Sequence, residues 1–507
     1  MMRCSLGLVP LRMAAVVGGL IAAFSGPLTA RDHFVEGPGE LPTALKAARA
    51  GDTVTLKNGA WNDVKVVVNR GGEPDSPMII RAETPGGVKL GGTSSLEINA
   101  PHVTVDGLWF HGGAITKGAV IQFKSHHGVV RNTAITDYNP ASFETEYYWV
   151  FFEGDDNRIE RCFFKGKNHL QPLIGNAIVD SRRNAVSRSH FKNVPYVAGA
   201  NGREIIRVWG SGKLEERDED GAYFTIEHNL FDRADGEGTE IISLKSNHNI
   251  VRHNTVIATR GGINIRRGNF NTVEHNVVLG QGIAGAQGLR MSGRDNVVRG
   301  NFVSGCSYGI RVACGEFIAD ALTPSYVPDV KPNGRKTADV RIPTYPQVKN
   351  LKLSDNVMVG ISGPDLEVGS SYKNHWPESQ QILLPEGCLI ENNRFVRSQG
   401  GDSVLVTLAE TTAPLDRFAF KPNTYRRNLL VGSGTVASAA QAGFATTAIA
   451  PDWSEANELA AFKPLAAEDV GPPWVIALRR AGQFSVEDAA SAERAEPPEP
   501  RKNKRKR

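Results

Sequence analysis

Short runs of alternating apolar and polar residues recur along the chain with the two-residue period of a β-strand. The runs TIEHNLF, NIVRHNTV, NTVEHNVV and NVVRGNFV place an asparagine at equivalent positions, spaced 25, 22 and 25 residues: Asn229, Asn254, Asn276 and Asn301. Self-similarity at a fixed period of this length is typical of a solenoid, in which each repeat stacks on the next. The pattern therefore predicts strand-rich coils rather than helices.

The same slot recurs on both sides of these four repeats. It falls on Asn132, Cys162 and Ser189 upstream, and on Asn356, Asn393 and Asn428 downstream. Asparagine tolerates left-handed backbone geometry, and stacked asparagines can satisfy one another in a ladder. Propeller blades need about 40 residues each and leucine-rich repeats need a leucine frame, and neither fits. We predict an all-β chain folded as a right-handed parallel β-helix.

The two ends of the chain differ from the repeats. Residues 1–30 contain two arginines, then an apolar run, then small residues up to a cleavage site expected after Ala30. This pattern predicts a secretory signal peptide and export to the periplasm or medium. No other apolar run is long enough for a transmembrane segment. Residues 485–507 are polar and end in six basic residues of seven, which predicts a disordered basic tail.

Residues 31–484 between these ends are expected to form one β-helix domain. The segment Leu41–Ala50 has a helical pattern and should cap the open first coil, because terminal repeats must hide the apolar end of the stack. Residues 316–350 are rich in proline and charge and should form a loop excursion. Residues 432–484 are less regular, and we expect them to close the far end.

Charge composition limits the classes of binding partner, and cysteine content limits the disulfides that the chain can form. Without the two arginines of the leader and the six cations of residues 501–507, 50 basic residues face 54 acidic ones. Such a body is no general polyanion binder and argues against nucleic acid as a partner, so an acidic ligand must be held by local arginines. Export permits disulfides, and Cys306 and Cys314 could form one across a short loop, although the sequence leaves this open.

Basic residues recur in the central repeats at nearly one per coil. Lys245 and Arg266 are 21 residues apart, close to one repeat, so we expect them on adjacent rungs about 5 Å apart. Arg267 adjoins Arg266, Arg290 follows 24 residues after Arg266, and Arg311 follows 21 residues later. This spacing predicts a cationic stripe along the solenoid, and arginine suits it because its planar fork binds carboxylates in bidentate fashion.

Two acids, Glu237 and Glu240, precede Lys245 in the segment DGEGTEIISLKS. A lysine held between acids and arginines can act as a base on an anionic substrate, since a neighbouring cation favours the neutral amine. The predicted stripe therefore indicates a site for an acidic polymer, with Lys245 as base, Arg266 as its partner, and Arg267, Arg290 and Arg311 as substrate contacts.

Four blocks carry a resemblance to a known family: NGREIIRVWGSG at 201–212, DGEGTEIISLKS at 235–246, INIRRGN at 263–269 and GLRMSG at 288–293. In order and spacing they resemble polysaccharide lyase family 6, which contains alginate lyases and chondroitinase B, and EDVGPPW at 468–474 fits as well. The resemblance implies a parallel β-helix that cleaves uronate-containing polysaccharides by β-elimination. It places the family's catalytic lysine on Lys245 and its catalytic arginine on Arg266.

The resemblance also implies calcium as a cofactor. The family's calcium ligands are an asparagine, which falls on Asn201, and two glutamates of a G-E-x-E-I-I-S block, which fall on Glu237 and Glu240. Here the block is one residue longer, so Gly238 stands where the first glutamate is expected and Glu237 must reach the metal through a bulge. Arg203 beside Asn201 also counts against calcium, and Arg267 replaces the family's histidine and could neutralise the substrate instead.

Alternative functions remain at this point. Within the resemblance, alginate is the expected substrate and dermatan sulfate the alternative. A pectinase-type hydrolase would use paired acids such as Asp155 and Asp156, but its other motifs are absent. A non-catalytic polysaccharide-binding β-helix would keep the arginine stripe without needing Lys245.

Overall fold

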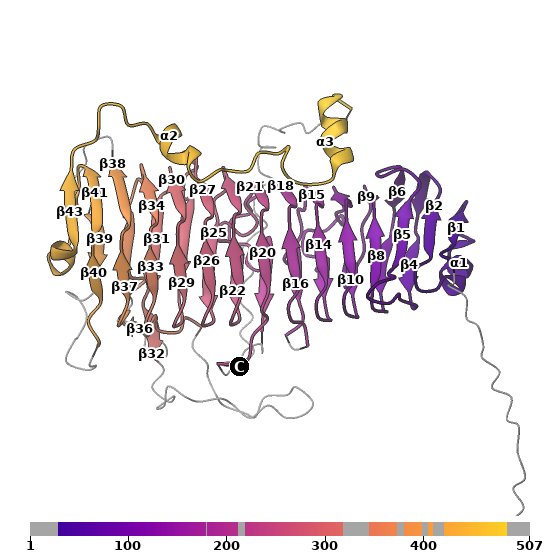
Figure 1. The fold of residues 1–507 in the computed structure, drawn as a ribbon, viewed down its shortest axis with the longest axis horizontal. Helices are drawn as coiled ribbons and strands as arrows, with labels where there is room; N and C mark the ends of the chain where they lie inside the picture. Colours follow the sequence, from indigo (N-terminus) through magenta and orange to yellow (C-terminus); the bar gives the residue numbers. More distant parts are fainter. Residues whose placement is uncertain are drawn as a thin grey trace, which may run out of the picture.

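The computed structural model describes residues 29–483 except 179, 211–217, 318–343, 373–379, 398–403 and 409–419. Most of the predicted signal peptide and the whole basic tail lie outside the described residues. The described chain is a right-handed parallel β-helix, as predicted, with three long parallel sheets and few helices (Figure 1). Each coil contributes one strand to each sheet in turn.

The sheets are called A, B and C in the order in which each coil visits them. Sheet A consists of β1 (Asp32–Val35), β2 (Thr53–Leu56), β5 (Met78–Ala82), β8 (Val103–Asp106), β11 (Val129–Arg131), β14 (Arg158–Glu160), β17 (Ala185–Ser187), β20 (Thr225–Glu227), β23 (Ile250–Arg252), β26 (Thr272–Glu274), β29 (Val297–Arg299), β33 (Lys352–Ser354), β37 (Leu389–Glu391) and β40 (Thr424–Arg426). Sheet B consists of β3 (Gly59–Asn62), β6 (Val88–Gly91), β9 (Leu108–His111), β12 (Ala134–Thr136), β15 (Phe163–Lys165), β18 (His190–Val194), β21 (Leu230–Ala234), β24 (Thr255–Ile257), β27 (Val277–Leu279), β30 (Phe302–Ser304), β34 (Val357–Val359), β38 (Arg394–Arg397), β41 (Asn428–Gly432) and β43 (Phe444–Thr447). Sheet C consists of β4 (Lys65–Val68), β7 (Ser95–Ile98), β10 (Ala119–Phe123), β13 (Tyr148–Phe152), β16 (Ile174–Asn176), β19 (Ile206–Trp209), β22 (Glu240–Lys245), β25 (Gly262–Arg267), β28 (Gln287–Met291), β31 (Tyr308–Ala313), β35 (Leu366–Ser370), β39 (Val404–Leu408) and β42 (Thr435–Val436).

The core follows from the alternation of the strands. In β22 the side chains of Ile242 and Leu244 point inward and are fully buried, and in β25 Ile263 and Ile265 occupy the same positions one rung on. Successive side chains of a strand point to opposite faces, so the residues between them face outward. Sheet C therefore presents a row of outward polar side chains on a rigid apolar base.

An asparagine ladder fixes the corner between sheets A and B. The side-chain oxygen of Asn276 accepts hydrogen bonds from the backbone N–H (3.0 Å) and the side-chain amide (2.9 Å) of Asn254. Asn276 in turn donates to the side-chain oxygen of Asn301 (3.0 Å) and to the carbonyl of Val251 (2.9 Å). Asn229, Asn356, Asn393 and Asn428 continue the ladder in the same way. The predicted ladder exists, and it holds successive coils in register.

Two details of the predicted ladder were wrong. The residue before each ladder asparagine, such as His253 (φ 53°) or His275 (φ 53°), takes the left-handed conformation, and the asparagine itself does not. Asn132 has φ 49° and so occupies this preceding position, and the buried Thr133 stands in the ladder slot. Sequence spacing alone cannot separate two adjacent polar positions at one corner.

A short helix covers the first coil. Helix α1 spans Leu41–Ala47, three residues less than expected, and its Leu41 and Leu45 are buried. These side chains are part of the continuous apolar core of the solenoid, together with Val54 and Val66 of the first coil. The helix therefore hides the apolar end of the stack.

The last segment of the chain lies along the outside of sheet B. The 3-10 helix η3 (Ser438–Gly443) and strand β43 complete the final coil, and α2 (Glu455–Ala460) and α3 (Pro473–Arg480) follow. Figure 1 shows this segment running back over the strands of sheet B toward the N-terminal half. The indole N–H of Trp474 donates to the carbonyl of Asn132 (2.7 Å), and the backbone of Leu465 donates to Thr255 (2.8 Å). Residues 448–482 thus contact strands or corners of sheet B in both halves of the solenoid.

The region of the predicted loop excursion leaves the solenoid after β31. Strand β32 (Gly315–Phe317) pairs antiparallel with β36 (Gln380–Leu383), and the chain rejoins sheet A at β33. Most of the excursion, 318–343, lies outside the described residues.

Cys306 is a buried free thiol that donates to the carbonyl of Ser304 (3.5 Å). It does not form the disulfide with Cys314 that the spacing of the two residues allowed. None of the helices in the described ranges has the length and apolar composition to cross a membrane.

Candidate active site

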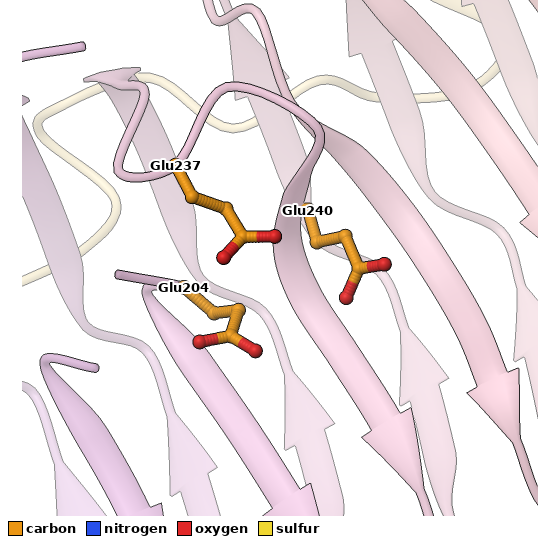
Figure 2. Close-up of side chains that lie close together, drawn as sticks. All are labelled: Glu204, Glu237 and Glu240. Carbon is orange, nitrogen blue, oxygen red and sulfur yellow. The ribbon is translucent and has the colours of Figure 1, made fainter. Parts of the chain in front are cut away.

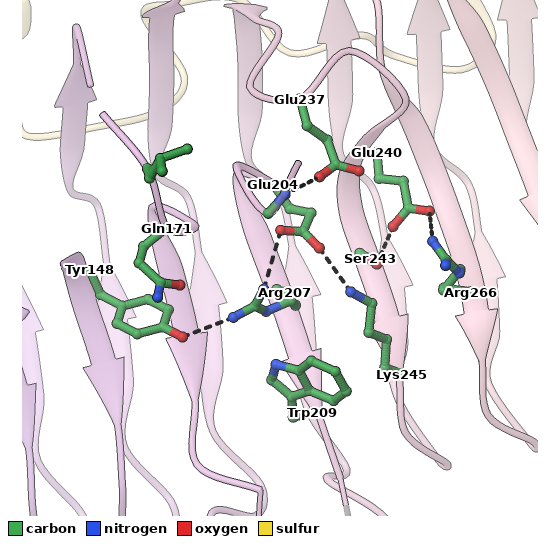
Figure 3. Close-up of polar contacts among 12 residues, drawn as sticks. Tyr148, Gln171, Glu204, Arg207, Trp209, Glu237, Glu240, Ser243, Lys245 and Arg266 are labelled. Atoms are coloured by element: carbon green, nitrogen blue, oxygen red, sulfur yellow. Dashed lines mark hydrogen bonds and ion pairs between the residues drawn. The ribbon is translucent and has the colours of Figure 1, made fainter. Parts of the chain in front are cut away.

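Lys245 and Arg266 lie on adjacent rungs, on the outer face of sheet C. Lys245 ends β22 and Arg266 is the penultimate residue of β25, and both side chains project outward because the inward positions are occupied by Leu244 and Ile265. Figure 3 shows both side chains on the same side of the sheet. The juxtaposition expected from the repeat length is present.

The Lys245 amine is held by a buried carboxylate and an indole. Its Nζ donates to Oε1 of Glu204 (2.9 Å) and lies 4.9 Å from the centre of the Trp209 ring. The guanidinium of Arg207 also lies over Trp209 (5.2 Å) and donates to the hydroxyl of Tyr148 (2.9 Å). The segment just before β19 and β19 itself therefore supply the neighbours of the amine, Glu204 and Trp209, and Lys245 stays partly exposed.

A second buried carboxylate holds two arginines. Arg266 Nη1 donates to Oε1 of Glu240 (3.1 Å), and Arg290 Nη2 donates to the same oxygen. The hydroxyl of Ser243 donates to the other oxygen of Glu240. Burial alone would raise the pKa of Glu240, but the charges of Arg290 and Arg266 outweigh it and hold the pKa below its usual value. Glu240 is therefore an anionic anchor for both guanidinium groups.

The cationic stripe is not in constant register. A register shift after Leu244 pairs Lys245 with Arg267, which leaves Arg266 as an additional residue in β25. Arg290 pairs with Asn264 on one side. Near-constant sequence spacing thus concealed a bulge, and bulges re-aim side chains at functional sites.

Arg311 marks the far end of the stripe. It pairs in register with Arg290, but its Nε donates to Glu367 (3.1 Å) and its guanidinium lies 3.5 Å from the centre of the Tyr308 ring. Of the expected substrate contacts, Arg290 therefore lies beside Arg266, and Arg311 lies one rung farther on and is already paired with an acid.

Glu237 reaches the site from the turn before β22. Its Oε2 accepts from the backbone N–H of Gly202 (2.7 Å) and its Oε1 from the hydroxyl of Thr239 (3.1 Å). Gly236 (φ 57°) and Gly238 (φ 81°) have left-handed conformations on either side of Glu237. The additional residue of the G-E-G-T-E segment is accommodated by this turn, which aims the Glu237 carboxylate toward Glu240.

The side chain of Arg203 stabilises that turn through hydrogen bonds to backbone carbonyls. Its side chain is buried, and its guanidinium donates to the carbonyls of Pro195 (2.9 Å), Gly236 (3.1 Å) and His169 (3.2 Å). Burial lowers the pKa of Arg203 to about 10. Lys167, also buried, donates to three further backbone carbonyls in the same region. Arg203 therefore holds the backbone that carries Glu237, through the carbonyl of the adjacent Gly236.

Three carboxylates converge beside Lys245 and Arg266. One oxygen from each of Glu204, Glu237 and Glu240 lies within 4.8 Å of the others. Figure 2 shows the three side chains close together. Burial, followed by the charges of Glu204 and Glu240, raises the pKa of Glu237. Three acids at this separation repel one another, so the cluster favours a cation at its centre.

The cluster has the chemistry of a calcium site. Oxygens that bind one calcium ion at 2.3–2.6 Å lie at most about 5 Å apart, which the three glutamates satisfy. Oε2 of Glu204 is buried and accepts no hydrogen bond, and its charged neighbour is the Arg207 guanidinium at 3.7 Å. Asn201 is exposed and immediately precedes Gly202, whose N–H binds Glu237. The residues present therefore fit a hard divalent cation, with Glu204 as a candidate ligand that the sequence did not suggest.

Sequence reasoning missed Glu204, Arg207, Trp209 and Tyr345. Glu204 follows Arg203 within the NGRE block, and Arg207 and Trp209 alternate outward in the next strand. That alternation was a usable signal. Tyr345, whose ring lies 4.2 Å from the Arg266 guanidinium, comes from the excursion after β31 and no repeat predicts its position.

The acid pair that suggested a hydrolase has a different role. Asp155 and Asp156 lie in the turn before β14, and both bind the guanidinium of Arg183 (3.0 and 2.8 Å). Asp156 has φ 58°, which suits a short polar residue at a tight corner. The two acids stabilise a turn in this structure.

Comparison with known proteins identifies the family. A model of the chondroitinase B family matches residues 35–310. The structure of the polysaccharide lyase family 6 enzyme Pedsa3628 from Pseudopedobacter saltans is 39% identical, with a TM-score of 0.73 over 87% of this chain and 99% of that one. The chain belongs to polysaccharide lyase family 6. It is a carbon–oxygen lyase that acts on polysaccharide.

Other solved members of the family share the fold. The alginate lyase AlyGC is 25% identical, with a TM-score of 0.71 over 87% of this chain and 58% of that one. A mannuronic acid-specific lyase from human gut microbiota is 22% identical, with a TM-score of 0.71 over 89% and 98% of the two chains, and supports the fold alone. Among proteins of curated function, none matches this chain significantly.

Proposed function

We propose that this family 6 lyase cleaves alginate by β-elimination, with Lys245 as the base and Arg266 as the group that stabilises the departing oxygen. The observation that carries the proposal is the placement of the Lys245 amine and the Arg266 guanidinium on adjacent rungs of one sheet face, each held by its own buried glutamate. The similarity to an alginate lyase that is 25% identical supports alginate as the polymer.

The chemistry needs one base and local positive charge. The C5 proton of a uronate is weakly acidic because the adjoining carboxylate is already negative, so cations must offset the charge that develops during its removal. In the proposed step the neutral amine of Lys245 takes the C5 proton, the C4–O bond breaks and a C4=C5 double bond forms. The leaving oxygen takes a proton from water.

Arg266 suits an electrostatic role better than proton donation. Burial alone would lower its pKa, but the charge of Glu240 outweighs burial and raises the pKa of Arg266. The guanidinium therefore keeps its charge while the C4–O bond breaks. Arg290, bound to the same oxygen of Glu240, and Arg267 on the same strand as Arg266 are proposed to bind substrate carboxylates.

Glu204, Glu237 and Glu240 are the residues that would hold calcium. A bound calcium ion would supply positive charge for the substrate carboxylate. Because Glu204 also binds Lys245, its charge is shared between the amine and any cation in the cluster. Arg267 is our proposed substitute if calcium binds weakly, and this proposal requires turnover to survive a chelator.

A substrate panel tests the function. Alginate, polymannuronate, polyguluronate and dermatan sulfate are each incubated with the protein, and the ultraviolet absorbance of the unsaturated product is followed. The proposal expects product from alginate or one of its block polymers. Product from dermatan sulfate alone would favour the second candidate, which the match to the chondroitinase B family model supports. We also propose export, since an alginate polymer lies outside the cell.

A further inference from the structure

The ring of Tyr345 lies on the arginines of the candidate site. Its centre is 4.2 Å from Cζ of Arg266 and 5.6 Å from Cζ of Arg290. Tyr345 belongs to neither strand but to the segment that rejoins the solenoid before β33. One aromatic ring therefore contacts both guanidinium groups that share Glu240.

Each of the two arginines has a buried N–H group without a hydrogen-bond partner, and an aromatic ring can take the place of that partner. The Nε atoms of Arg266 and Arg290 are buried and have no hydrogen-bond partner. A buried N–H without a partner is costly, and the electron-rich face of an aromatic ring attracts a guanidinium and its N–H groups. Glu240 holds the tips of the two guanidinium groups, and Tyr345 is the aromatic group that lies over them.

The backbone fixes the ring in place. The carbonyl of Tyr345 accepts from the N–H of Glu316 (2.8 Å) in β32, and the carbonyl of Pro346 accepts from the N–H of Gly293 (3.3 Å) just beyond β28. Val348 is buried in the main core. The backbone around Tyr345 is thus tied to β32 on one side and to the chain just after β28 on the other, which sets the position of Tyr345 relative to Arg266.

We infer that Tyr345 is a positioning residue for the elimination, and that its ring holds the Arg266 guanidinium where the leaving oxygen develops charge. The inference rests on the proposed function of Arg266. It assigns the effect to the ring and not to the hydroxyl, because the contact in the structure is between the ring face and the guanidinium. A group that positions another acts on turnover more than on substrate binding.

The experiment compares Tyr345→Leu, which removes the ring, with Tyr345→Phe, which removes only the hydroxyl. Both are assayed for kcat and KM on the uronate polysaccharide that the unaltered protein cleaves best. Tyr345→Leu should lower kcat about five- to thirtyfold, the size of a partly desolvated cation–π contact, with KM within about threefold of the unaltered value. Tyr345→Phe should retain kcat within about threefold.

Tyr223→Leu is the matched control. Tyr223 is an exposed tyrosine whose ring is also stacked on a neighbour, His248, but it lies just before β20 of sheet A, and neither of these residues belongs to the carboxylate cluster. Its loss should leave kcat unchanged. If Tyr345→Leu does not fold, Tyr345→Met replaces it as the ringless variant.

Three results would overturn the inference: unchanged kcat in Tyr345→Leu, an equal loss in Tyr345→Phe, or a change confined to KM. These differ from failure of the proposed function, in which the unaltered protein itself releases no unsaturated product.

Discussion

Replacing Asn276 with alanine should destabilise the β-helix far more than an ordinary asparagine substitution. The Asn276 side chain donates to Asn301, Val251 and Glu274 and accepts two hydrogen bonds from Asn254, all within the buried ladder. Alanine leaves the N–H and amide of Asn254 and the carbonyl of Val251 without this partner. Each unsatisfied buried group costs about 1–3 kcal/mol, so we expect a loss of about 3–5 kcal/mol.

Thermal unfolding measures this loss. In a chain of this length the entropy of unfolding makes 1 kcal/mol correspond to about 1 °C in Tm, so Asn276→Ala should unfold about 3–5 °C lower. Asn69→Ala is the control, because Asn69 is exposed and accepts a single bond from Asn99 (2.7 Å). Its Tm should change by less than about 1 °C.

Asn276→Ser tests the mechanism of the loss. At the same slot Ser189 accepts from the N–H of Cys162 (3.1 Å) and donates to the carbonyl of Ser187 (3.0 Å), so a hydroxyl can serve part of the ladder. Serine should therefore cost less than alanine. If Asn276→Ala and Asn69→Ala unfold at the same temperature, the ladder does not contribute as reasoned.

Three further predictions concern the site and the outer segment. Arg203→Ala removes four hydrogen bonds to backbone carbonyls and should lower Tm by several degrees and weaken calcium binding measured by calorimetry, whereas retained binding would show that Arg203 does not position Glu237. Calcium should raise Tm, and Glu204→Gln should abolish that rise. Because the pKa of Glu237 is raised, acidification should weaken calcium affinity at a higher pH than for a site with ordinary glutamates. A pH-independent affinity would contradict this. Trp474→Ala should lower Tm without changing kcat, since Trp474 anchors residues 448–482 to sheet B away from sheet C, and a lower kcat would refute this separation.

The repeat made the fold predictable. Strand alternation and the recurring asparagines predicted the parallel β-helix, because both features follow from local backbone geometry and repeat in every coil. They also predicted that Lys245 and Arg266 would lie on adjacent rungs. The exact register did not follow, because a single-residue bulge after Leu244 changes the pairing by one position without altering the repeat length.

Contacts between distant segments were beyond the sequence argument. Glu204 comes to Lys245 across 41 residues, and Tyr345 reaches Arg266 from an excursion with no repeat of its own. The path of residues 448–482 along sheet B depends on the contact between Trp474 and Trp109, and no local sequence pattern specifies that contact. Sequence periodicity describes neighbours along the solenoid, whereas these contacts are made by segments outside it.

The most direct test of the account is the rate of unsaturated product formation by Lys245→Ala. Loss of a general base lowers kcat by about 10²–10⁴-fold, so we predict a fall in this range with polysaccharide binding retained. Lys124→Ala is the control, because Lys124 follows β10 of the same sheet and is paired with Glu97 (3.0 Å), and it should keep full activity. If Lys245→Ala forms product within about tenfold of the unaltered rate, Lys245 is not the base and the proposed elimination is wrong.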